Sequence, residues 1–189
     1  MEHINPEDKL NELSIKRDSH AEDMVDHYWG SINYITSLIK ASELKAGLIL
    51  SFYGILLNFI FKSVETLFAG KSIDVILYVL AGFWFCVTAS SIFYCIQCFI
   101  PRIEGKFDKN ILFFGDVISK FGSVKDFSKT FYEVSLDEER LFQQMGEQIF
   151  VISKISAWKF ENVKWAIRLL GIQLLLLLII VFYYLVSTI

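Results

Sequence analysis

The stretch LLGIQLLLLLIIVFYYLVSTI, residues 169–189, decides the fold of this chain. It carries no charged side chain and reaches the length of about 20 residues that a helix needs to cross a bilayer core. A second uncharged run, Val75–Ile100, exceeds that length. A third, Ala46–Phe61, is shorter, but Lys45 and Lys62 flank it and can extend their ammonium groups toward the headgroups. We predict an all-α membrane protein with three transmembrane helices, over residues 46–61, 75–100 and 169–186.

The distribution of basic residues predicts the orientation of these spans. Five Lys and Arg precede the first span and eleven lie in residues 101–168, whereas the loop 62–74 has two. Because cytoplasmic segments are enriched in Lys and Arg, the N-terminus and residues 101–168 are predicted to be cytoplasmic. Residues 1–30 contain no apolar core of a signal peptide, so the first span is expected to act as the insertion signal. The net charge of −3 gives no reason to expect a nucleic-acid partner.

The first and third spans are predicted to continue out of the membrane as amphipathic helices. Residues 1–18 are polar and are predicted to be disordered, and an apolar heptad stripe then runs into the first span. Ser135 and Glu138 form an S-x-x-E capping box, which predicts the start of a long helix that ends in the third span. We therefore expect a cytoplasmic helical bundle of residues 19–45 and 101–168. The apolar stripes, of coiled-coil type, need a partner in the same chain or in a second copy; they comprise Val25, Tyr28, Ile32, Ile35 and Ile39, and Phe142, Met145, Ile149 and Ile152.

No motif of a known enzyme class is present. The chain has no P-loop, no dinucleotide-binding fingerprint, no G-x-S-x-G and no H-E-x-x-H. Cys95 and Cys98 form a C-x-x-C pair inside an apolar span, where packed thiols fit better than a redox or zinc site. His20, Asp23 and His27 share one helix face that could ligate a metal, but their acidic neighbours favour a solvated charged face. We predict no catalytic residue, no cofactor and no metal site.

Three segments resemble the membrane effectors of Pycsar anti-phage systems. They are Glu43-Leu-Lys-Ala-Gly-Leu48, Asn110-Ile-Leu-Phe-Phe-Gly-Asp116, and Glu147-Gln-Ile-Phe-Val-Ile-Ser-Lys154 followed by Ile-Ser-Ala-Trp-Lys-Phe160. These segments are similar to a D-T-K-A-like motif, an N-L-L-F-F-G-D-like motif and an E-Q-I-Y-x-L-S-x-I-A-x-x-K-Y-like helix, in the order of the family. The resemblance covers residues 22–186. Glu43 and Leu44 differ from the usual Asp and Thr, whereas Lys45 is kept.

The resemblance implies a function that the composition does not show. In such systems a partner pyrimidine cyclase makes cyclic CMP or cyclic UMP on phage infection. The effector senses the nucleotide in the cytoplasm and impairs the inner membrane of the bacterium, which causes abortive infection. The alternative, from a different class, is a non-signalling oligomeric membrane scaffold. The heptad stripes favour a homo-oligomer in both cases.

The candidate ligand-binding residues combine cations with the resembling motifs. A cyclic nucleotide carries one negative charge, so its site needs at least one cation. Lys154 is the first choice and Lys159 the second, because both belong to the helix that resembles that of the family. Lys154 also lies farther from the third span than a membrane-flanking cation needs to. Asn110 and Asp116 are expected to have a structural or a ligand-binding role rather than a catalytic one. The full predicted set is Lys154, Lys159, Lys45, Asn110, Asp116 and Gln148.

Overall fold

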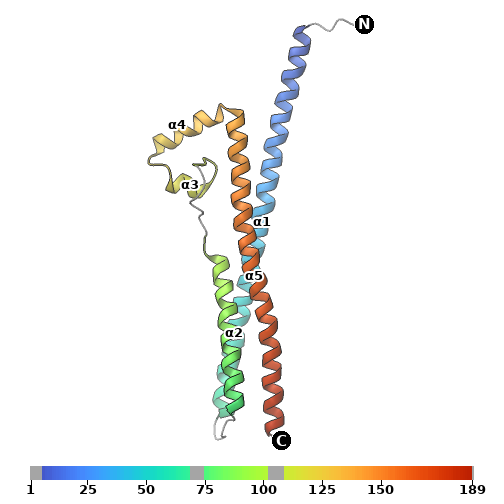
Figure 1. Cartoon of the computed structure of the whole chain (residues 1–189), viewed down its shortest axis with the longest axis vertical. Coiled ribbons are helices and arrows are strands. Elements are labelled where there is room, and N and C mark those ends of the chain that lie inside the picture. The colour runs from blue at the N-terminus through green and yellow to red at the C-terminus, as the bar shows by residue number, and fades with distance from the viewer. Residues whose placement is uncertain (1–5, 69–74, 102–108, 189) are drawn as a thin grey trace, which may run out of the picture. The chain divides into compact units, whose positions relative to one another are not determined.

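The computed structural model describes the backbone of residues 6–68, 75–101 and 109–188, and the side chains of residues 20–63, 75–101 and 109–186. Over these residues the chain forms helices and no strand (Figure 1), which confirms the all-α class. The helices are α1 (Pro6–Phe68), α2 (Val75–Phe99), α3 (Phe114–Ser119), α4 (Val124–Ser135) and α5 (Glu138–Thr188).

Three of these helices, α1, α2 and α5, are long and apolar enough to cross a membrane. The chain is therefore a multi-pass membrane protein, as the apolar runs predict. The 63 residues of α1 and the 51 residues of α5 far exceed the roughly 20 that a bilayer core requires. The prediction that the first and third helices extend beyond their spans is thus confirmed.

The N-terminal boundary of α1 differs from the prediction. The helix begins at Pro6, so residues 6–18 of the segment predicted to be disordered are helical. Proline suits the first turn of a helix, where its missing N–H is not needed for an intrahelical bond. Residues 1–5 of that segment lie outside the described residues.

The predicted capping box at the start of α5 is wrong. Ser135 is the last residue of α4, and its Oγ donates a hydrogen bond to the carbonyl oxygen of Phe131 at 2.7 Å. Asp137 caps α5 instead, because its Oδ1 accepts a hydrogen bond from the backbone N–H of Arg140 at 3.2 Å. The hydroxyl of Ser135 is therefore used by the helix that ends there, and α5 begins at Glu138.

The chain divides into two compact units. The first unit comprises Met1–Ser37 and Ile103–Lys154, and the second unit comprises Leu38–Arg102 and Ile155–Ile189. Both α1 and α5 contribute residues to each unit.

In the first unit the apolar stripes of α1 and α5 are covered by their own chain. The stripe residues from Val25 to Ile35 and from Phe142 to Ile152 are buried or half-buried. A hydrogen bond of 2.6 Å from Tyr28 Oη to Gln148 Oε1 joins the two helices. The partner that these stripes require is therefore found within the chain for this unit.

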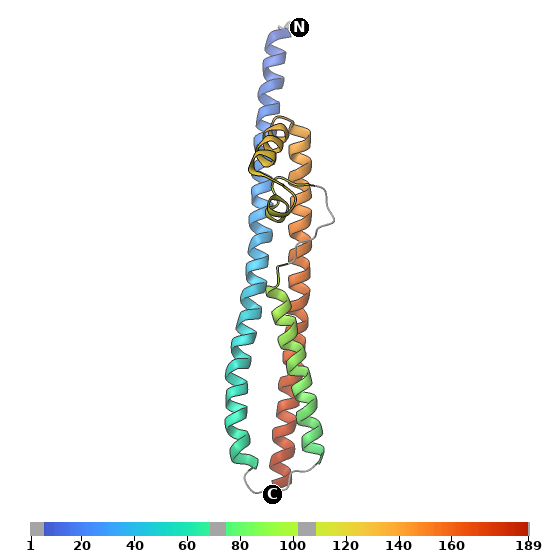
Figure 2. The ribbon, with the colours of Figure 1, turned by 90° about the vertical axis from the view of Figure 1, so that its left-hand side faces the viewer.

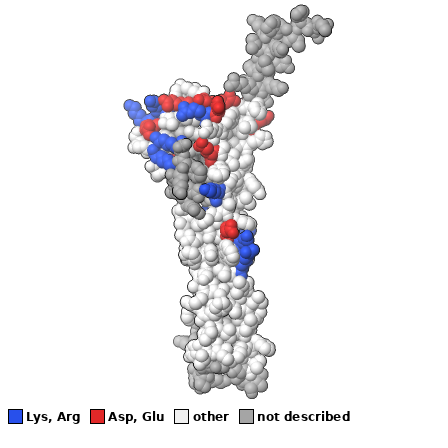
Figure 3. Space-filling view, viewed as in Figure 1, with Lys and Arg blue, Asp and Glu red and all other residues white. Residues whose placement is uncertain are grey.

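The second unit is a packed set of three helices, with α2 beside α1 and α5 (Figures 1 and 2). Ala46 of α1 and Ala166 of α5 are 0% exposed, and such small residues let helices approach closely in lipid. In Figure 3, the described side chains of the second unit below its one group of charged residues are uncharged on the face that is shown. The core of the second unit consists of Ala46, Ile49, Tyr53, Cys95, Cys98, Val163 and Ala166.

Candidate functional site

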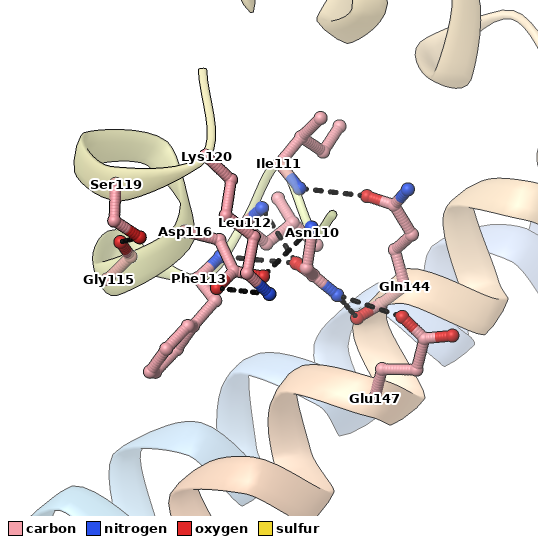
Figure 4. A network of polar contacts seen from close by, with 10 residues as sticks. All are labelled: Asn110, Ile111, Leu112, Phe113, Gly115, Asp116, Ser119, Lys120, Gln144 and Glu147. Atoms are coloured by element: carbon pink, nitrogen blue, oxygen red, sulfur yellow. Dashed lines mark hydrogen bonds and ion pairs between the residues drawn. The ribbon is translucent and has the colours of Figure 1, made fainter. Parts of the chain in front are cut away.

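Hydrogen bonds from the side chain of Asn110 hold the segment that precedes α3 against the helix α5 (Figure 4). Asn110 is 4% exposed, and its Nδ2 donates to the carbonyl oxygen of Gln144 at 2.8 Å and to Glu147 Oε2 at 3.3 Å. Its Oδ1 accepts the backbone N–H groups of Leu112 and Phe113 at 2.9 and 3.1 Å, which forms a turn that Asn favours. Both polar atoms of this side chain are therefore engaged in contacts within the protein.

Asp116 closes the same network from the first turn of α3. It is 2% exposed, and its Oδ2 accepts the backbone N–H of Asn110 at 3.1 Å. Its Oδ1 pairs with Lys120 Nζ at 2.9 Å, one turn further along. A buried carboxylate needs such a cation and donor to offset its lost hydration. The motif Asn110–Asp116 thus builds an internally satisfied clasp, which the Gln144 side chain completes by accepting the N–H of Ile111 at 2.9 Å.

Lys109, beside this clasp, holds an exposed ion pair. Its Nζ donates to Asp126 Oδ2 at 2.9 Å and lies 4.1 Å from the centroid of the Phe121 ring. The hydrogen bond from Lys109 lowers the pKa of the Asp126 carboxyl below its ordinary value. The Asp126 carboxylate partly cancels the positive charge of Lys109.

A pocket of about 560 Å³ in the first unit has the wrong charge for a nucleotide phosphate. Three carboxylates line it and no Lys or Arg does, so the pocket repels an anion. None of the six predicted ligand-binding residues lines it. Its lining consists of Ala21, Glu22, Val25, Asp26, Ser135, Leu136, Glu138, Leu141 and Phe142.

In the second unit a buried lysine joins all three long helices. Lys159 of α5 is 5% exposed, and its Nζ donates to Glu43 Oε1 of α1 at 2.5 Å and to the carbonyl oxygen of Cys98 at 2.7 Å. Cys98 lies in the last turn of α2, where the unpaired carbonyl groups carry partial negative charge. The ammonium is therefore held by one carboxylate and one helix C-terminus.

The other predicted cations are placed differently. Lys45 is exposed, and its Nζ lies 6.0 Å from the centroid of the Phe160 ring, at the limit of a cation–π contact. Lys154 is exposed and is the last residue of α5 that belongs to the first unit. Lys154 belongs to the first unit, as do the Asn110–Asp116 clasp and Gln148, whereas Lys45 belongs to the second unit.

Sequence reasoning missed the partners of these residues. Gln144 and Glu147 are three positions apart on α5, a spacing that puts both on the face that receives Asn110. In the sequence, Glu43 stood out only because it replaces the Asp of the family's first motif. In the structure it supplies the carboxylate that pairs with Lys159. Over the described residues, no group of three or more His, Cys, Asp or Glu side chains could hold a metal ion.

The fold and these clusters define an all-α, multi-pass membrane protein whose first and third helices extend well beyond the length of a span. A profile of the Pycsar effector protein domain matches residues 27–186, which is most of the chain. The protein thus belongs to the Pycsar effector family of anti-phage defence, as the resembling motifs predict. This is not a known enzyme family. No curated protein and no solved structure matches the chain.

Proposed function

We propose that this protein is an anti-phage effector that senses cyclic CMP or cyclic UMP in the cytoplasm and then impairs the integrity of the bacterial inner membrane. The partner is a pyrimidine cyclase, and the outcome is abortive infection. The effector acts as a homo-oligomer with a cytoplasmic N-terminus. Residues 19–45 and 101–168 form its sensing region.

The observation that carries this proposal is the continuity of α1 and α5. Each helix runs without interruption from the first unit into the apolar part of the second unit. A ligand that prefers one packing of these helices over another shifts the equilibrium between the packings by its differential affinity. A tenfold preference supplies about 1.4 kcal/mol per site. Several sites coupled in an oligomer add these contributions and can drive a closed assembly open.

The exposed cation Lys154 is the proposed phosphate-binding group. Lys159 is already enclosed by Glu43 and the Cys98 carbonyl, so a phosphate would have to displace a short ion pair to reach it. Lys154 is exposed on the helix that also receives the Asn110–Asp116 clasp. Lys45, Asn110, Asp116 and Gln148 remain secondary candidates.

Exposed aromatic side chains on α1 and α5 support the homo-oligomer. Trp29, Tyr34 and Phe150 are 55, 65 and 56% exposed, although they belong to the first unit and not to the apolar spans. Aromatic side chains are enriched at protein–protein contacts because they bury a large area at a low cost in conformational entropy. A second copy would cover them.

The proposal is tested by the melting temperature of the purified full-length protein in detergent. Cyclic CMP or cyclic UMP should raise it, because a ligand at 100 times its Kd stabilises the folded state by about 2.7 kcal/mol. Cyclic AMP and cyclic GMP should have little effect. Lys154→Ala should abolish the shift, and Lys125→Ala, which removes an exposed lysine of α4, should keep it.

Two results would contradict the proposal. A melting temperature that no cyclic pyrimidine nucleotide changes would favour the non-signalling scaffold. A full shift in Lys154→Ala would place the phosphate at a different cation.

A further inference from the structure

The interior of the second unit buries several polar side chains beside its apolar core residues. The buried residues of α2 recur every three or four positions, so they share one helix face. The aromatic side chains Phe83, Phe85 and Phe93 are 56, 59 and 56% exposed on the rest of the surface. The buried face of α2 consists of Trp84, Thr88, Ser91, Cys95 and Cys98.

The helices α1 and α5 each add one buried polar side chain within their spans. Tyr53 of α1 is 1% exposed and lies beside Ser91 and Cys95 of α2. Gln173 of α5 is 0% exposed. We refer to the polar residues of this interior as the polar seam; they are Tyr53, Trp84, Thr88, Ser91 and Gln173.

Two members of the polar seam have polar atoms without a hydrogen-bond partner. These atoms are Trp84 Nε1 and both amide atoms of Gln173. The hydroxyl of Tyr53 lies against the side chain of Ser91. Thr88 and Ser91, in contrast, donate to the carbonyl oxygens of Trp84 and Ala166. An unpaired polar group in the hydrocarbon region costs free energy, because no water is available to replace the missing partner. Leucine or phenylalanine would serve a simple anchor better at these positions.

The polar seam covers a defined depth of the spans. Ser91 Oγ donates to the Ala166 carbonyl oxygen at 2.9 Å, which fixes the register of α2 against α5. The two helices run in opposite directions (Figure 1), so Gln173, seven residues after Ala166, reaches the level of Trp84, seven residues before Ser91. At 1.5 Å per residue this distance is roughly 10 Å.

The buried face of α2 also ends at the polar seam. No residue of α2 from Val75 to Phe83 is buried, whereas buried residues continue from Trp84 to Cys98. Both apolar and polar side chains therefore close the three helices against each other inside the spans, and the polar ones are those of the seam. Separation of α2 from α1 and α5 would expose this face first.

We propose that the polar seam is the closed form of a water path, and that Tyr53, Ser91 and Gln173 line it when the spans separate. This inference rests on the proposed function, because impairing a membrane requires a hydrated route through it. Water in the open state satisfies the atoms that are unpaired in the closed state. The contact of Lys159 with the Cys98 carbonyl holds the adjacent end of α2 to α5 in the closed state.

The path is tested by cysteine accessibility in liposomes that contain the full-length protein. The native cysteines Cys86, Cys95 and Cys98 are replaced by alanine, and one new cysteine is added. Ser91→Cys puts the thiol in the seam, and Ser90→Cys puts it on the exposed face one residue earlier. With a cyclic pyrimidine nucleotide, a charged methanethiosulfonate reagent in the bath should modify Ser91→Cys at least tenfold faster than Ser90→Cys. Equal rates, or leaking vesicles in which Ser91→Cys stays unmodified, would overturn the proposal.

A second variant tests the seam independently of any nucleotide. Gln173→Leu removes both unpaired amide atoms and should raise the melting temperature of the closed protein in detergent. Gln97→Leu, at a half-buried position of α2 outside the seam, is the matched control and should change it less. A lower melting temperature for Gln173→Leu would show that the amide stabilises the closed state, and would overturn the inference. If the wild type never leaks with either nucleotide, the proposed function fails, and this comparison still decides whether the seam disfavours the closed state.

Discussion

Asn110 shows how one side chain can hold a loop to a helix. Its amide supplies two donors to α5 and its carbonyl oxygen accepts two backbone N–H groups. An amide is the side chain that combines both abilities on neighbouring atoms, so neither an acid nor an aliphatic residue can replace it.

Asn110→Asp should therefore destabilise the first unit although the shape of the side chain hardly changes. The new carboxylate oxygen would face the Gln144 carbonyl oxygen and the Glu147 carboxylate, which lie 2.8 and 3.3 Å from the amide nitrogen. We expect a loss of roughly 2–3 kcal/mol in the free energy of unfolding, measured by thermal unfolding in detergent. Asn33→Asp, at an exposed position of α1, is the control. Equal melting temperatures of the two variants would contradict the structural role of Asn110.

The ion pair of Lys159 and Glu43 should respond asymmetrically to substitution. Glu43→Ala leaves the ammonium of Lys159 buried, whereas Lys159→Met leaves a carboxylate whose side chain is 37% exposed and can be hydrated. We expect Glu43→Ala to cost roughly 2–3 kcal/mol of unfolding free energy and Lys159→Met about 1 kcal/mol. The double variant should cost less than the sum of the two. Additive costs in a double-mutant cycle would show that the two side chains do not interact.

At the scale of elements, the sequence predicted what depends on apolar content and periodicity. The uncharged runs predict the spans because only a helix satisfies its own backbone in lipid. The start of α5 was missed because Ser135 and Asp137 both suit an N-cap, and the choice depends on where α4 ends.

Hydrogen exchange can show whether Ser135 or Asp137 caps the N-terminus of α5. Asp137→Ala should lower the hydrogen-exchange protection of the first turns of α5 by about 1 kcal/mol, because it removes the acceptor for the Arg140 N–H. Ser135→Ala should leave that protection nearly unchanged. If Ser135→Ala causes the larger loss, the capping box is present after all and the described end of α4 is wrong.

At the scale of the whole molecule, the sequence identified the family but not the pairing of the candidate site residues. Lys154 and Lys159 look alike in the sequence, since both belong to the same resembling helix. Only the fold shows that one is exposed and the other is enclosed by Glu43, which lies 116 positions away in the sequence. Likewise, the sequence does not indicate a special role for Gln173. Only the fold shows that its side chain is completely buried and that both amide atoms lack a hydrogen-bond partner.

The orientation in the membrane is a further prediction for the whole chain. Reporter tags at the N-terminus and near Asp126 should be cytoplasmic, and a tag after Ile189 should be periplasmic. The eleven cations of residues 101–168 motivate this expectation. A C-terminal tag found in the cytoplasm would contradict the crossing of three spans.

The most direct test of the central claim is the nucleotide-triggered leakage of liposomes that contain the purified full-length protein. Vesicles filled with a fluorescent dye should leak within minutes after cyclic CMP or cyclic UMP is added, and should stay sealed with cyclic AMP or without nucleotide. Lys154→Ala should suppress this leakage, and Lys125→Ala should not. Vesicles that hold the correctly folded wild-type protein and remain sealed with both pyrimidine nucleotides would contradict the claim that this chain converts such a signal into membrane damage.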